Sequence, residues 1–160
     1  MKRPVRSKKA KSQRNSGRSS KGSGSVHSLH EHRPHLGLEA TIERAVPHEW
    51  TLAFYDPRLP AVLSTPSMIG MMEIAASESV LNDLPPGAIT VGTRIEVDHL
   101  KAVPEGTMVR ATARLAEHKG RFMVFDVEAV AGEHLIGRGR VYRAIVEPEK
   151  FHAKAHARAT

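Results

Sequence analysis

The sequence of 160 residues contains no cysteine, which excludes a disulfide scaffold, a cysteine-based zinc site and a cysteine nucleophile. No apolar run reaches the ~18 residues that a membrane-spanning helix needs. The N-terminus also lacks the apolar stretch of a secretory signal. From these two absences we expect a soluble, cytoplasmic protein. The length suits one ordinary domain.

The basic residues are concentrated at the N-terminus. Residues 1–37 hold ten of the 24 Lys and Arg residues and one of the 17 acidic residues, so the rest of the chain is close to neutral. Residues 1–36 also carry few sizeable apolar side chains and cannot offset the entropy lost on ordering. We therefore predict a disordered basic tail over residues 1–36 and a domain over residues 37–155.

The charge of this tail would allow weak, salt-dependent contact with nucleic acid or an anionic surface. A solvated tail without a dedicated partner is the alternative. The tail contains four histidines at irregular spacing, from which we predict no metal site. They are His27, His30, His32 and His35.

The rest of the chain divides into one helix and a series of strands. Residues 66–84 are apolar on most sides, begin with Pro66 and end before Pro85, which predicts a buried helix. Residues 38–45 suit a short strand or a helical turn. Four further segments alternate between apolar and polar residues and are joined by short turns, which predicts an antiparallel meander with one wet face. These segments are 88–100, 107–117, 121–130 and 134–146.

A sheet with one apolar face must cover that face, and the single helix is the element available to do so. We therefore predict an α+β fold in which the antiparallel sheet wraps around one long buried helix, the hotdog arrangement. Such domains pair through their sheets, so we expect at least a homodimer.

Three polar residues interrupt the apolar faces. Glu73 lies among methionine, isoleucine and alanine residues of the predicted helix, while His99 and Arg143 continue the apolar faces of two strands. A desolvated carboxylate is unfavourable by several kcal/mol unless it is paired or neutralised. These residues therefore suggest a site, with a structural ion pair between Glu73 and Arg143 as the alternative.

Three motifs in order resemble the fluoroacetyl-CoA thioesterase family over roughly residues 50–155. The first is Thr65-Pro66 followed by Glu73, and the second is Val91-Gly92-Thr93 with Val97-Asp98-His99. The third is the ending Arg143-Ala144-Ile145-Val146. The resemblance implies hydrolysis of an acyl-CoA thioester with Thr65, Glu73 and His99 as the catalytic residues.

The resemblance and the chemistry together suggest a role for each residue. Glu73 attacks the thioester carbonyl or aligns water, and His99 acts as general base. Thr65 hydrogen-bonds the carboxylate or the substrate. The backbone N–H of Gly92, from the same or a partner subunit, donates to the oxyanion. Arg143 orients the acyl group or Glu73. Neither a metal nor a cofactor is expected, and CoA enters as part of the substrate.

One segment departs from the family pattern. The namesake carries aromatic residues in a lid before the helix, whereas an ungapped count places Asp56 and Leu59 here, with Phe54 and Tyr55 just upstream. We therefore expect a short-chain acyl-CoA rather than a specifically fluorinated one. An enoyl-CoA hydratase or dehydratase and a non-catalytic acyl-CoA-binding module remain the alternatives.

Overall fold

The computed structural model describes residues 33–159, so the predicted tail, including His27, His30 and His32, lies almost entirely outside the described residues. The elements follow the predicted order, and the segment at residues 38–45 is a strand. They are β1 (Glu39–Ala45), η1 (His48–Trp50), α1 (Leu52–Tyr55), α2 (Thr65–Val80), η2 (Leu81–Asp83), β2 (Ile89–His99), β3 (Met108–Lys119), β4 (Phe122–Ala131), β5 (His134–Val146) and α3 (Pro148–Ala159).

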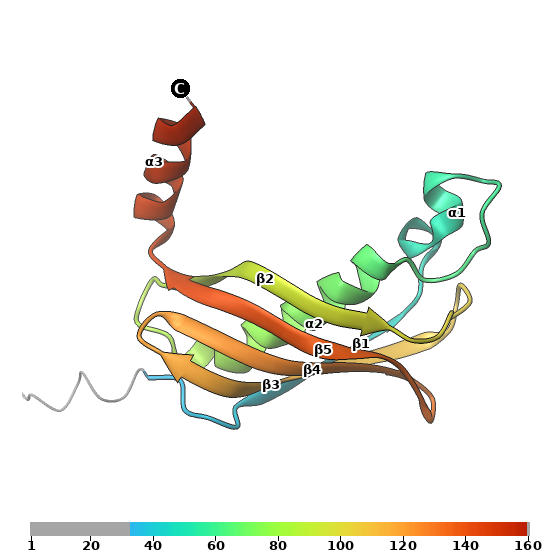
Figure 1. The fold of residues 1–160 in the computed structure, drawn as a ribbon, viewed down its shortest axis with the longest axis horizontal. Coiled ribbons are helices and arrows are strands. Elements are labelled where there is room, and N and C mark those ends of the chain that lie inside the picture. The colour runs from blue at the N-terminus through green and yellow to red at the C-terminus, as the bar shows by residue number, and fades with distance from the viewer. Residues whose placement is uncertain (1–32, 160) are drawn as a thin grey trace, which may run out of the picture.

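The five strands form one antiparallel sheet in the order β1-β3-β4-β5-β2. The sheet curves around α2, and α3 projects from the end of β5 (Figure 1). Alternate residues of β3 and β4, such as Val109, Leu115 and Phe125, are buried against α2, as their alternation predicts. The strands β3, β4 and β5 form the predicted meander, but β2 pairs with β5 rather than with β3, so the prediction of a four-strand meander is wrong. In this order β1 and β2 are the two edge strands.

The helix α2 begins at a capped turn. The side chain of Ser64 accepts a hydrogen bond from the backbone N–H of Ser67, and Thr65 and Pro66 open the helix. The helix ends at Val80 and continues as the short 3₁₀ turn η2, so it is shorter than the predicted span of 66–84. The pair Pro85-Pro86 prevents any further extension because proline cannot supply the backbone donor.

One stripe of α2 faces away from the sheet and is not fully covered. The buried residues of α2 include Met68, Met72 and Ala76, whereas Ile74 is half exposed. A surface pocket runs along the open stripe, at positions three or four residues apart on one side of the helix. Its helical members are Gly70, Glu73, Ile74, Ser77 and Glu78. Within one chain, the prediction of a buried helix therefore holds for the side of α2 that faces the sheet.

The strand β2 contains a bulge. Strict alternation along residues 88–100 predicts that Ile89 and Val97 lie on the inward, apolar face and Thr90 on the polar face. The register against β5 shifts between Gly92 and Arg94. The predicted inward face holds after the shift, where Val97 packs against the core. Before the shift it is wrong: Thr90 is buried, while Ile89 is exposed. A bulge adds one residue to one strand, and one residue exchanges the two faces of a strand.

The N-terminal end of the described chain packs against the domain, and the C-terminal end extends from it as a helix. Pro34 is buried and its carbonyl oxygen lies 3.0 Å from Nδ1 of His118. At the other end, the helix α3 was not predicted, although Pro148 suits a first turn and alanine and lysine favour a helix. Among residues 33–159 there is no helix with the length and apolar character required to cross a membrane.

Candidate active site

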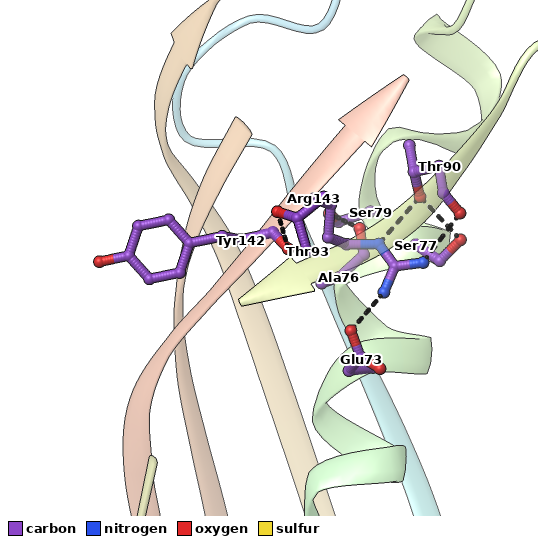
Figure 2. A network of polar contacts seen from close by, with 8 residues as sticks. All are labelled: Glu73, Ala76, Ser77, Ser79, Thr90, Thr93, Tyr142 and Arg143. Atoms are coloured by element: carbon purple, nitrogen blue, oxygen red, sulfur yellow. Dashed lines mark hydrogen bonds and ion pairs between the residues drawn. The ribbon is translucent and has the colours of Figure 1, made fainter. Parts of the chain in front are cut away.

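An ion pair connects the middle of α2 to β5. Nη1 of Arg143 donates to Oε1 of Glu73 over 2.9 Å. The same guanidinium donates through Nε to the hydroxyl of Thr90 and through Nη2 to the backbone carbonyl of Thr90. The hydroxyl of Ser77, one turn beyond Glu73, lies 3.3 Å from that of Thr90. Figure 2 shows how this network joins α2, β2 and β5 around Glu73.

The two partners of the ion pair differ in exposure. The side chain of Arg143 is 9% exposed, whereas that of Glu73 is 32% exposed. Burial lowers the pKa of Arg143 and the charge of Glu73 opposes that shift, but a guanidinium remains protonated at neutral pH. Arg143 is therefore a fixed cation behind Glu73, and the carboxylate faces a surface pocket of about 490 Å³.

Gly92 lies directly against the carboxylate of Glu73. A Cβ built on Gly92 would overlap Oε1 and would lie 3.2 Å from the carboxyl carbon. Only glycine allows the backbone of β2 to approach the acid this closely. Of the residues singled out in the sequence, the structure thus brings together Glu73, Gly92 and Arg143.

Thr65 and His99 form a second group at the N-terminal end of α2. The hydroxyl of Thr65 lies 2.9 Å from Nδ1 of His99, and Nε2 of the ring lies 3.0 Å from the carbonyl oxygen of Lys101. A carbonyl can only accept, so Nε2 carries the proton and a neutral ring has Nδ1 free to accept from Thr65. This arrangement prepares the hydroxyl of Thr65 to pass a proton to His99.

The two groups are separated within one chain. Glu73 follows Thr65 by eight positions on α2, which corresponds to ~12 Å of helix rise. Thr65 and His99 line their own surface depression of about 290 Å³, together with Leu52 and Lys101. Within a single chain the two groups therefore lie apart on α2, each beside its own surface depression.

The sequence analysis did not single out three members of these groups: Ser77, Thr90 and the backbone carbonyl of Lys101. Strict alternation places Thr90 on the polar face, whereas the bulge beside Gly92 turns it inward. The backbone carbonyl of Lys101 has no signature in the side-chain pattern. Among residues 33–159, no three side chains of His, Asp or Glu gather as metal ligands.

Comparison with known proteins identifies the family. The model of the fluoroacetyl-CoA-specific thioesterase family matches residues 46–149. The chain belongs to this family. The fluoroacetyl-CoA thioesterase of Streptantibioticus cattleyicolor is 38% identical over 125 residues, which cover 74% of this chain and 90% of that protein.

Solved structures of the fluoroacetyl-CoA thioesterase family and of its superfamily share the fold. One of the fluoroacetyl-CoA thioesterase FlK has a TM-score of 0.73 and 34% identity, covering 78% of this chain and 97% of its own. A thioesterase superfamily member from Thermus thermophilus has a TM-score of 0.72 and 31% identity, covering 78% of this chain and 93% of its own. The predicted hotdog fold is confirmed, and the protein is a thioester hydrolase.

Proposed function

We propose that the protein hydrolyses short-chain acyl-CoA thioesters at a site built from two copies of the chain. Thr65 and His99 come from one protomer, and Glu73, Gly92 and Arg143 come from the other. The observation that carries this proposal is the separation of two complementary half-sites along α2, each open to the surface. The relative from Streptantibioticus cattleyicolor, named for its action on fluoroacetyl-CoA, supports the substrate class.

The surface between the half-sites suits a second copy of the chain. The strand β2 is an edge strand, and an exposed edge offers unpaired backbone groups to another strand. Ile95 on β2 and Ile74 on α2 are 37% and 50% exposed, so burying these two side chains in a subunit contact would stabilise that contact. A two-fold contact uses the same surface of both copies and creates each composite site twice.

The positions of the half-sites fit such a two-fold contact. Antiparallel pairing of two β2 strands centred near Ile95 places His99 of one copy opposite Gly92 of the other. Antiparallel crossing of two α2 helices near Gly70 places Thr65 of one copy opposite Glu73 of the other. No side chain lies within 4 Å of a Cβ built on Gly70, which leaves room for the second helix.

The composite site holds the groups that thioester hydrolysis needs. In one route Glu73 attacks the carbonyl carbon, the C–S bond breaks as the anhydride forms, and water then opens the anhydride; in the other, Glu73 positions the water that attacks the thioester directly. In either route water gives a proton to the Thr65 hydroxyl while that hydroxyl gives its own proton to Nδ1 of His99. In the direct route the C–S bond breaks after water has attacked, and in both routes the CoA thiolate takes the proton from the imidazolium.

Gly92 and Arg143 support this chemistry from the partner protomer. The backbone N–H at Gly92 is the proposed donor to the developing oxyanion. Arg143 holds one carboxylate oxygen of Glu73, which fixes the direction of the other oxygen toward the substrate.

The proposed acyl group is short because the depression beside Thr65 is small, at about 290 Å³. Leu52 and Val62 contribute apolar surface to it. Phe54 and Tyr55 of α1 are 56% and 64% exposed and do not line this depression in one chain. We therefore propose a general short-chain acyl-CoA substrate.

Thiol release over a panel of acyl-CoAs tests the proposal, with wild type and Glu73→Ala assayed in parallel. We expect hydrolysis of short acyl-CoAs by the wild type and a loss of at least a hundredfold in the variant. Binding without hydrolysis across the panel would favour a binding module, whereas hydration of crotonyl-CoA without thiol release would favour a hydratase. Either of these two results would reject the hydrolase proposal.

A further inference from the structure

A third pocket lies where α3 leaves the sheet. The identity of its ligand, argued below, depends on the proposed function, whereas the pocket itself does not. Its volume is about 510 Å³, within the range of small-molecule sites. Pro85, Ile145 and Phe151 contribute apolar surface to it. Most of its lining residues come from the end of β5, from α3 and from the chain between α2 and β2, and Figure 1 shows these segments meeting where α3 leaves the sheet.

The polar side of this pocket is strongly basic. Three cations line it, from two separate elements: Arg121 at the turn between β3 and β4, and Lys150 and Lys154 one turn apart on α3. Glu147 is the acid among its described lining residues, and it pairs with Lys150 over 2.7 Å. Arg121 and Lys154 have no carboxylate partner within residues 33–159, so their charge is available to an anion.

An exposed aromatic side chain accompanies these cations. Phe151 is 48% exposed although it adjoins the apolar floor of the pocket. An aromatic face can stack on a nucleobase, while arginine and lysine bind phosphate oxygens. Cations beside an accessible ring suit a phosphorylated nucleotide better than they suit an isolated phosphate.

The pocket lies within reach of Glu73. Gly92, beside the carboxylate, pairs with Arg143, and the floor residues Ile145 and Val146 follow on the same strand. Three residues of strand correspond to ~10 Å. The flexible pantetheine arm, which separates the thioester from the phosphates in CoA, bridges a gap of this order.

We propose that this pocket binds the 3′-phospho-ADP portion of the CoA substrate. Arg121 and Lys154 contact its phosphates, and Phe151 stacks on its adenine. The carboxylate of Glu73 and the nucleotide pocket of the same protomer then hold the two ends of one acyl-CoA molecule.

Equilibrium binding of 3′-phospho-ADP to the full chain tests this site without requiring hydrolysis. We expect the double variant Arg121→Gln/Lys154→Gln to raise the Kd about tenfold, since charged hydrogen bonds are lost. Arg110→Gln is the control, because it removes a cation from the opposite end of β3, far from the pocket. Like the double variant, it keeps the basic residues 1–36. Failure of the wild type to bind, or an equal loss in the control, would overturn the proposal.

Two further comparisons identify the ligand and separate this proposal from the hydrolase proposal. Phe151→Ala should weaken 3′-phospho-ADP while leaving the binding of inorganic pyrophosphate unchanged; an equal effect on both would remove the stacking role. The double variant should raise the KM for acetyl-CoA but not for acetyl-pantetheine, with kcat retained. Hydrolysis with an unchanged KM would overturn the pocket alone, whereas nucleotide binding without hydrolysis would overturn the hydrolase alone.

Discussion

Gly92 of β2 and Glu73 of α2 are packed so closely that a single methyl group on the glycine would overlap the carboxylate. The carboxylate is therefore confined on two sides, by the backbone of Gly92 and by the guanidinium of Arg143. This confinement determines where the acid can point, and it makes the site sensitive to changes that leave Glu73 itself in place.

Replacement of Gly92 by alanine should displace the carboxylate of Glu73. We expect a loss of roughly 1–3 kcal/mol in the free energy of unfolding from overpacking. We also expect at least a tenfold fall in kcat, because the acid no longer points toward the substrate. Urea unfolding and thiol release measure the two effects. In a Glu73→Ala background the same replacement should leave stability nearly unchanged, and an undiminished loss there would show that the clash involves other atoms.

Removal of Arg143 should affect both folding and catalysis. Arg143→Ala breaks the ion pair and the two hydrogen bonds to Thr90, and we expect a loss of about 2–4 kcal/mol in the free energy of unfolding. Arg143→Lys retains the charge but loses the forked geometry, so its loss should be smaller. Chemical denaturation of both variants checks this order. Equal stability of Arg143→Ala and the wild type would contradict the importance of the network.

Ser64 and Thr65 are adjacent but should behave differently. Ser64 caps α2, so Ser64→Ala should lower the free energy of unfolding by ~1 kcal/mol with a modest change in kcat. Thr65→Val removes the hydroxyl that contacts His99 and should reduce kcat by at least a hundredfold with little change in stability. Thr65→Ser keeps the hydroxyl and should recover much of the activity. If Thr65→Val proved fully active, the proton route through Thr65 would be wrong.

Mixed dimers should recover activity that each parent lacks. His99→Ala inactivates one half-site and Glu73→Ala the other, so a heterodimer of the two variants contains one intact composite site. After denaturation and joint refolding, we expect about a quarter of wild-type activity, because half of the dimers are mixed and each has one working site. Separately refolded variants are the control. Absence of recovery, with heterodimers present by mass spectrometry, would place the site within one chain.

Much of the fold could be predicted because hydrophobic alternation along β3 and β4 continues without interruption. The buried faces containing Val109 and Phe125 follow directly from that alternation. The helix α2 could be predicted from an apolar run bounded by prolines, and Glu73 was singled out because a carboxylate among methionines contradicts its surroundings. In both cases the pattern in the sequence corresponds to a local physical requirement.

The remaining features depend on contacts that a linear pattern does not contain. The faces of Thr90 and Ile89 were exchanged because a bulge changes the phase of β2 without changing its composition. The separation of Thr65 from Glu73 follows from the length of α2, and only the three-dimensional arrangement reveals it as two half-sites. The helix α3 was missed because it follows the last strand and has little burial to mark it.

The bulge between Gly92 and Arg94 also sets a limit on how β2 can diverge among relatives. Apart from Gly92, side chains along this strand can be exchanged one at a time, but the number of residues between Thr90 and Ile95 is constrained. Loss of one residue would turn Thr90 outward and bring apolar neighbours against Glu73, while His99 would stay where it is. Insertions and deletions should therefore be rarer in this short segment than in the loops, even where its sequence varies.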